Sequence, residues 1–237
     1  MIELGLGLLS IGRPWGRRRE PPPSEADALA LLESATALGI RFLDTAPAYG
    51  ESEAILGRFL RESCATPFIA TKMGEFWEGE RSTVDHSYEA LRRSIDRSLE
   101  RLGRIDLLQI HKATAENLAT EDVLRAIAYA RSCGVRKFGA SVADLEAAQA
   151  AIRTEWCSWL QFPFSRANTT LAPIFELARK TAIKLIINRP LAMGELRPSA
   201  DAFAFIRDMR FNGAILTGTK SMAHLIENHA AFHAQES

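Results

Sequence analysis

The sequence predicts an α/β fold, and specifically a closed (β/α)8 TIM barrel that forms a single domain over residues 1–237. Its length of 237 residues is close to the roughly 250 residues typical of such a barrel. Short apolar segments alternate with amphipathic helical segments, eight of each, as βαβ units require. No linker divides the chain, although residues 21–23 are three consecutive prolines. A doubly wound open sheet is the alternative that the same alternation allows.

The boundaries of these segments follow from periodicity and from capping residues. The first helix is expected to begin at Ser24, where Asp27 completes a capping box, and to end at Gly39. The further helices are expected at residues 53–61, 86–102, 121–133, 144–152, 169–181, 200–209 and 222–233. The strands are expected at residues 2–9, 40–43, 68–71, 105–110, 137–140, 158–161, 183–187 and 214–216.

The composition is that of an ordinary globular protein, with 47% hydrophobic and 24% charged residues. Lys and Arg total 29, as do Asp and Glu, so the chain has no net charge to attract nucleic acid or an anionic membrane. The apolar stretch at residues 4–11 precedes the basic cluster at 17–19, which is the wrong order for a secretory signal. The three cysteines are widely spaced and form no disulfide or zinc motif, so we expect a cytoplasmic location.

In a barrel of this kind, the functional residues lie at the carboxyl ends of the strands. The polar residues that end the expected strands are Asp44, Lys72, His111, Ser141, Gln161, Asn188 with Arg189, and the segment from Thr217 onward. A closed barrel would bring these distant positions to one cavity.

Four of the residues form a chemically coherent set. Asp44 and Lys72 end neighbouring strands and are expected to form a buried ion pair. A lysine cation beside Tyr49 would lower the phenol pKa from about 10 and make Tyr49 a general acid. His111 could bind a substrate oxygen, so the set suits protonation of a carbonyl oxygen while hydride arrives at carbon. Each residue alone is equally typical of a helix cap, a solvated lysine or a packed ring. His111 lacks further ligands at metal-binding spacing, so no metal site is expected.

The segment Leu-Gly-Ile-Arg-Phe-Leu-Asp-Thr-Ala-Pro-Ala-Tyr-Gly at residues 38–50 resembles the signature of the aldo-keto reductase family. The resemblance continues through Ser52-Glu53 and Leu56-Gly57, and then through residues 69–72, 94–111, 134–139 and 218–228. It therefore covers nearly the whole chain in the order of the family.

This resemblance implies a barrel that binds NADP(H) in an extended pose and carries a catalytic tetrad of Asp44, Tyr49, Lys72 and His111. It implies that Tyr49 is the general acid–base, that Lys72 with Asp44 tunes it, and that His111 orients the carbonyl. The implied cofactor contacts are Ser141 and Gln161 at the nicotinamide amide, Asn188, Arg189 and Leu191 after the seventh strand, Gly218, Lys220, Ser221 and His224 around the 2′-phosphate, and Asn228 at the adenine.

The chain departs from the family pattern in three places. Val142 replaces the Asn that follows the Ser, so one carboxamide hydrogen bond is expected to be absent. Asn188 stands where an aromatic ring often stacks on the nicotinamide, and Arg189 is expected to approach the cofactor phosphates instead. The chain ends soon after its last helix, so the long loop that often closes the substrate pocket is expected to be missing, and the pocket is expected to be more open or closed by a partner.

The sequence therefore predicts NADPH-dependent reduction of an aldehyde or ketone to an alcohol, with a small-molecule carbonyl substrate. A catalytically weak NADP(H)-binding sensor or auxiliary protein is the alternative from another class. An aldolase or isomerase with Lys72 as Schiff base is disfavoured, because Asp44 should keep Lys72 charged. NADPH is expected over NADH because Lys220 and Ser221 begin a helix and residues 217–226 contain no acid. Neither the substrate's identity nor the oligomeric state follows from the sequence.

Overall fold

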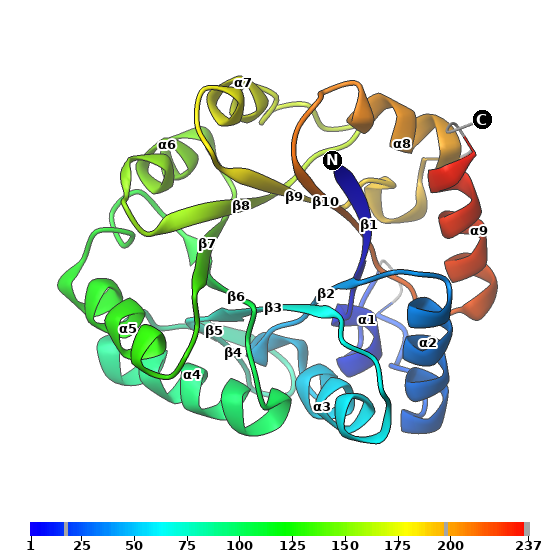
Figure 1. Ribbon diagram of the computed structural model, residues 1–237, viewed down its shortest axis with the longest axis horizontal. Helices are drawn as coiled ribbons and strands as arrows, with labels where there is room; N and C mark the ends of the chain where they lie inside the picture. The colour runs from blue at the N-terminus through cyan, green and yellow to red at the C-terminus, as the bar shows by residue number, and fades with distance from the viewer. Residues whose placement is uncertain (17–18, 197–198, 235–237) are drawn as a thin grey trace.

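Eight parallel strands close into a barrel in the computed structural model, which describes residues 1–16, 19–196 and 199–234 (Figure 1). The strands follow one another around the barrel in the order β1-β10-β9-β8-β7-β6-β3-β2. The expected barrel is confirmed, and the open doubly wound sheet is excluded because β1 pairs with both β2 and β10. Arg17 and Arg18 of the basic cluster lie outside the described residues.

Every expected strand is present, within a few residues of its expected limits. The barrel strands are β1 (Ile2–Gly7), β2 (Phe42–Asp44), β3 (Phe68–Met73), β6 (Leu107–Ala113), β7 (Lys137–Val142), β8 (Cys157–Pro163), β9 (Lys184–Asn188) and β10 (Gly213–Thr217).

The helices form the outer ring around the barrel (Figure 1). They are α2 (Glu25–Ala37), α3 (Ser52–Glu62), α4 (Tyr88–Leu102), α5 (Glu121–Ser132), α6 (Leu145–Arg153), α7 (Pro173–Arg179), α8 (Ser199–Arg207) and α9 (Met222–His233). Ser24 caps α2 by accepting the Asp27 backbone N–H at 3.2 Å, as the capping box predicts. Within the described residues, no helix has the length and apolar character needed to span a membrane.

The barrel interior is built in two layers, because alternate residues of each strand point inward. The lower layer is apolar and consists of Phe42, Ala70, Leu107, Trp159, Ile186 and Ala214, and Leu216, two positions after Ala214, packs against it. Two positions further along their strands, Phe42 is followed by Asp44 and Ala70 by Lys72. The same alternation therefore sets a polar layer above the apolar one, at the carboxyl ends of the strands.

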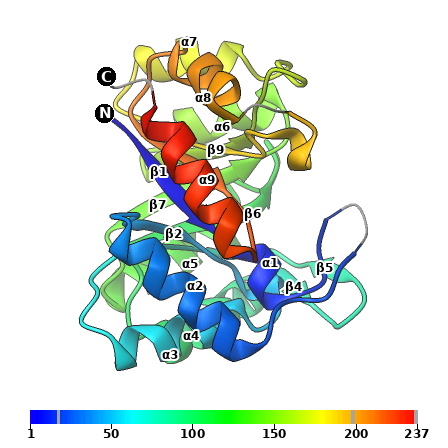
Figure 2. The ribbon, with the colours of Figure 1, turned by 90° about the vertical axis from the view of Figure 1, so that its right-hand side faces the viewer.

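Several elements at this end of the barrel are not anticipated from the sequence. Short α1 (Leu9–Gly12) follows β1, and a two-stranded hairpin of β4 (Glu75–Trp77) and β5 (Ser82–Val84) follows β3. Single-turn helices η1 (Pro47–Tyr49) and η2 (Ala192–Gly194) follow β2 and β9. Figure 2 shows α1 and the hairpin at the same end of the barrel. They form part of the rim of the site.

Candidate active site

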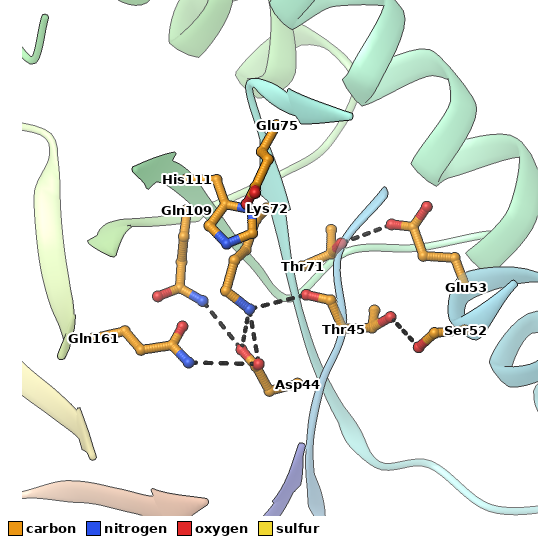
Figure 3. A network of polar contacts seen from close by, with 10 residues as sticks. All are labelled: Asp44, Thr45, Ser52, Glu53, Thr71, Lys72, Glu75, Gln109, His111 and Gln161. Carbon is orange, nitrogen blue, oxygen red and sulfur yellow. Dashed lines mark hydrogen bonds and ion pairs between the residues drawn. The ribbon is translucent and has the colours of Figure 1, made fainter. Parts of the chain in front are cut away.

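Asp44 and Lys72 form a buried ion pair in the polar layer (Figure 3). Lys72 Nζ lies 2.8 Å from Asp44 Oδ1 and 2.7 Å from Oδ2, and it donates to the Thr45 carbonyl oxygen at 3.0 Å. Burial lowers the pKa of Lys72, but Asp44 and Tyr49 together outweigh burial and place that pKa above its ordinary value. Lys72 is therefore a fixed cation with its three donors used, and it cannot act as a neutral Schiff-base lysine.

Tyr49 is brought against this pair by η1, which follows β2 directly. Lys72 Nζ lies 4.8 Å from the centre of the Tyr49 ring, and the His111 ring meets it edge-on with 5.9 Å between centroids. Burial raises the pKa of Tyr49 above its ordinary value, and Lys72 only partly offsets this effect. The expected lowering of the Tyr49 pKa is thus wrong for the protein alone, because desolvation of the phenolate outweighs the nearby cation. At neutral pH the phenol keeps the proton that a general acid must donate.

His111 lies beside a carboxylate that the sequence reasoning missed. Its Nδ1 is 2.9 Å from Oε2 of Glu75, and both side chains are more than nine-tenths buried. Burial raises the pKa of Glu75, but the contact with His111 outweighs burial and lowers that pKa to about 2. Burial lowers the pKa of His111 despite Glu75. Because Nδ1 faces the Glu75 carboxylate, Nε2 is the ring nitrogen left free for the substrate side.

The hairpin explains how Glu75 reaches the site. In β4, Glu75 and Trp77 share one face, whereas Phe76 points to the other face and lines a cavity of about 840 Å³ on the outside of the barrel. The signal in the sequence is the position of Glu75, three residues after Lys72. Because the neighbouring residues are mostly apolar, Glu75 does not stand out as part of a polar cluster in the sequence.

The upper layer also contains buried oxygen atoms without partners among the described residues. Gln109 and Gln161 donate their amide nitrogens to Asp44 at 3.3 and 3.4 Å, which leaves each Oε1 unpaired. Asn188 Oδ1 and Thr217 Oγ1 are likewise buried and unpaired. Gln109 was not among the expected site residues. Buried acceptors of this kind call for a donor, and the carboxamide N–H2 of a nicotinamide would supply one.

The neighbouring strand ends place the other expected nicotinamide contacts. Ser141 pairs with Gln161 in the β7–β8 register, so these two residues lie side by side. Val142 is buried in the packing between barrel and helices, and its side chain has no hydrogen-bonding group to offer. After Asn188, Arg189 adopts a left-handed φ of 55° and is exposed, and Leu191 precedes η2 in the same loop. Such a conformation is unusual for a residue with a side chain.

The expected phosphate-binding residues meet at the start of α9. Ser221 caps this helix by accepting the His224 backbone N–H at 3.4 Å, and Gly218 lies just before it, after β10. Lys220 Nζ donates to the Pro21 carbonyl oxygen at 2.8 Å and lies 3.0 Å from Glu20 Oε2. Residues 217–226 contain no acid, but Glu20 approaches this segment from the loop before α2.

Asn228 lies on α9 four residues after His224, which is about one helical turn further along. It is buried, and its Oδ1 accepts a hydrogen bond from Ser199 of α8 at 3.5 Å. Among the residues that the structure describes, no group of three or more His, Cys, Asp or Glu side chains is placed to hold a metal ion.

A closed parallel barrel with a polar cluster at the carboxyl ends of its strands defines a class of barrel enzymes. Comparison with known protein families identifies the family. The sequence model of the Aldo/keto reductase family matches residues 3–207. The chain belongs to the aldo/keto reductase family. This family uses nicotinamide cofactors for carbonyl and sugar oxidoreduction.

Individual relatives agree with this assignment. The chain is 35% identical over 140 residues to pyridoxal 4-dehydrogenase of Microbacterium luteolum. This alignment covers 47% of this chain and 40% of the relative. The chain is 40% identical over 116 residues to L-galactose dehydrogenase of Arabidopsis thaliana, covering 46% of this chain and 33% of the relative. These alignments thus span less than half of each curated relative.

A solved structure matches over a much larger share. The crystal structure of an aldo-keto reductase from Pseudomonas aeruginosa superposes with a TM-score of 0.87 at 30% identity. That match covers 99% of this chain and 90% of the other.

Proposed function

We propose that this chain reduces an aldehyde or ketone to the corresponding alcohol with NADPH, acting as one domain over residues 1–237. The observation that carries the proposal is the placement of a protonated phenol, Tyr49, between the Lys72 cation and the His111 ring. The three cysteines are free, which agrees with a cytoplasmic location.

In the proposed reaction, Tyr49 donates its phenolic proton to the carbonyl oxygen as that oxygen gains negative charge. The carbonyl carbon would receive its hydride from NADPH, held by the residues at the carboxyl ends of β7 to β10. The Lys72 cation stabilises the phenolate left on Tyr49, and Asp44 holds Lys72 in place through both carboxylate oxygens. His111 binds the carbonyl oxygen through Nε2. This contact requires a proton on Nε2. Since Nδ1 faces the Glu75 carboxylate, the ring would have to be an imidazolium in the reaction, a state that Glu75 favours and burial opposes.

The cofactor would lie across the carboxyl ends of β7 to β10. Ser141, Gln161 and Asn188 would hold the nicotinamide amide, which agrees with the unpaired buried oxygens of Gln161 and Asn188. The loop that carries Arg189 and Leu191 would follow the phosphates. Gly218, Lys220, Ser221 and His224 would hold the 2′-phosphate at the amino terminus of α9, where backbone N–H groups and the helix dipole favour an anion. Asn228 would contact the adenine.

A second candidate is a weakly catalytic NADP(H)-binding sensor or auxiliary protein. It is favoured by Val142, which offers no side-chain hydrogen bond beside Ser141, and by Glu20, which already engages Lys220. The complete Asp44, Tyr49, Lys72 and His111 set favours catalysis over this candidate.

The two candidates are separated by incubating the purified protein with NADPH and a panel of aldehydes, ketones and quinones. We expect NADPH oxidation with at least one carbonyl compound and one alcohol formed per NADPH consumed. Tight NADPH binding without reduction of any carbonyl compound would instead support the sensor.

A further inference from the structure

Arg13 lies at the rim of the site, directly after α1, and is only 9% exposed. Its guanidinium carbon lies 4.2 Å from the centre of the Trp77 ring and 5.7 Å from that of Trp15. The backbone beside it is fixed to the Tyr49 segment, because the Gly12 carbonyl oxygen accepts the Glu51 N–H at 3.0 Å. A side chain on Gly50 would come within 3.2 Å of Arg13 Cβ. Arg13 is therefore a neighbour of the loop that carries the proposed proton donor.

The donors of Arg13 are only partly used. Its Nη1 donates to Ser82 Oγ at 3.0 Å, while its Nε is buried with no hydrogen-bond partner. Among the described residues, no carboxylate lies within 4.0 Å of this guanidinium. The carboxylate of Glu75, which acts on Arg13 electrostatically, is already in contact with His111 at 2.9 Å.

The charge of Arg13 persists in this environment. Burial lowers its pKa, and Glu75 and Tyr49 partly offset that effect. Because the guanidinium pKa starts above 12, Arg13 stays a cation at neutral pH. A buried cation without an ionic partner is costly, and an anionic partner that supplies several acceptors would offset the cost. The flat fork of an arginine between two aromatic rings matches a carboxylate well.

We propose that Arg13 forms the subsite for an acidic group on the substrate, so that the protein reduces aldehydes or ketones that carry a carboxylate. The acidic group would bind the unused guanidinium N–H groups between Trp15 and Trp77, while the carbonyl reaches Tyr49 and His111. This inference rests on the proposed reductase activity and adds the substrate class to it.

Matched pairs of probes test the inference, because each pair differs in charge and hardly in shape. The pairs are 4-formylbenzoate with 4-formylbenzamide, 3-formylbenzoate with 3-formylbenzamide, and 4-oxobutanoate with 4-oxobutanamide. We expect the unaltered protein with NADPH to prefer the acid over the amide at least tenfold in kcat/KM for one or more pairs. Equal kcat/KM values in every pair would overturn the inference, and this result depends on no variant.

Two variants then locate the preference. In Arg13→Met the acid-to-amide ratio should fall at least tenfold, with the loss mainly in KM for the acid, and Arg13→Lys should keep part of the ratio. Arg81→Met is the matched control, since Arg81 belongs to the same hairpin region, is largely exposed and pairs with Glu78. An unchanged ratio in Arg13→Met, or an equal loss in Arg81→Met, would overturn the assignment to Arg13.

A binding measurement separates this inference from the proposed function. If the protein with NADPH reduces neither the probes nor any compound of the carbonyl panel, the reductase proposal fails. Calorimetry with the NADP+-loaded protein would still test the subsite through 4-formylbenzoate. Binding at least tenfold tighter than that of 4-formylbenzamide, lost in Arg13→Met, would support the subsite; equal binding of the two probes would overturn it.

Discussion

Two buried cations lie close to Tyr49, and they differ in how they are neutralised. Lys72 is held by both oxygens of Asp44 and by a backbone carbonyl, at distances of 2.7 to 3.0 Å. Arg13 has one hydroxyl partner, two aromatic rings and a buried Nε with no partner. A cation with every donor used is suited to fix the electrostatics of its neighbours. A cation with unused hydrogen-bond donors is suited to bind an external anion. On this account Lys72 serves the chemistry of the site and Arg13 serves its substrate specificity.

The largest expected effect comes from removing the fully paired cation. Lys72→Met should lower kcat by about a hundredfold or more, because the Tyr49 phenolate loses its stabilising charge. The same change leaves Asp44 buried without its ionic partner. The free energy of unfolding should therefore fall by about 3 kcal/mol. Steady-state rates and urea denaturation measure the two effects.

Lys137→Met is the control for this change, because Lys137 is exposed and stacks on Phe68 at the opposite end of the barrel. It should leave kcat within about twofold. Wild-type turnover in Lys72→Met would show that the Lys72–Asp44 pair serves folding alone.

A smaller effect is expected from Glu75, which contacts His111 and is linked to Arg13 through Ser82. Glu75→Gln should lower kcat by about ten- to a hundredfold. Since Glu75 raises the pKa of His111, its removal should move the pH at which activity declines to a lower value. Glu78→Gln, an exposed change in the same hairpin region, should not move the profile. An unshifted profile in Glu75→Gln would remove the proposed role of the imidazolium.

Glu75 also predicts how stability depends on acid. Its pKa of about 2 in the folded protein lies below the ordinary value of 4.5. The stabilisation is therefore present above about pH 4.5 and is lost as the pH falls toward 2. Denaturation of Glu75→Gln should show a weaker decline over this range.

The smallest effect concerns the choice of cofactor. NADPH should bind at least tenfold tighter than NADH, which corresponds to about 1.4 kcal/mol. Lys220→Ala should erase much of this gap by weakening NADPH binding alone. Glu20→Gln should widen it severalfold, because Lys220 is released from a carboxylate 3.0 Å away. Equal affinities for both cofactors in the unaltered protein would exclude a 2′-phosphate site at α9.

Local patterns were sufficient to predict the barrel and the residues at its strand ends. Phe42 and Asp44 are two positions apart on one strand, so the apolar and polar layers can both be derived from period-2 alternation. Several helices likewise begin at a side-chain cap that the sequence contains, as at Ser24, Asp144 and Ser221.

The missing features depend on contacts between distant segments. Glu75 and Ser82 lie on three-residue strands, which are too short for a periodic signal, and their role becomes visible only when the hairpin meets α1. Glu20 and Lys220 are 200 positions apart in the sequence. The pKa of Tyr49 was mispredicted for a related reason, because the degree of desolvation depends on packing that no local pattern specifies.

The central claim is that Tyr49 donates the proton in carbonyl reduction, and Tyr49→Phe tests it most directly. The change removes the hydroxyl and keeps the ring, so the contacts with Lys72 and His111 remain possible. With a carbonyl compound that the unaltered protein reduces, the account predicts that kcat falls about a hundredfold or more while the affinity for NADPH stays the same. Turnover within about threefold of the unaltered protein would contradict it.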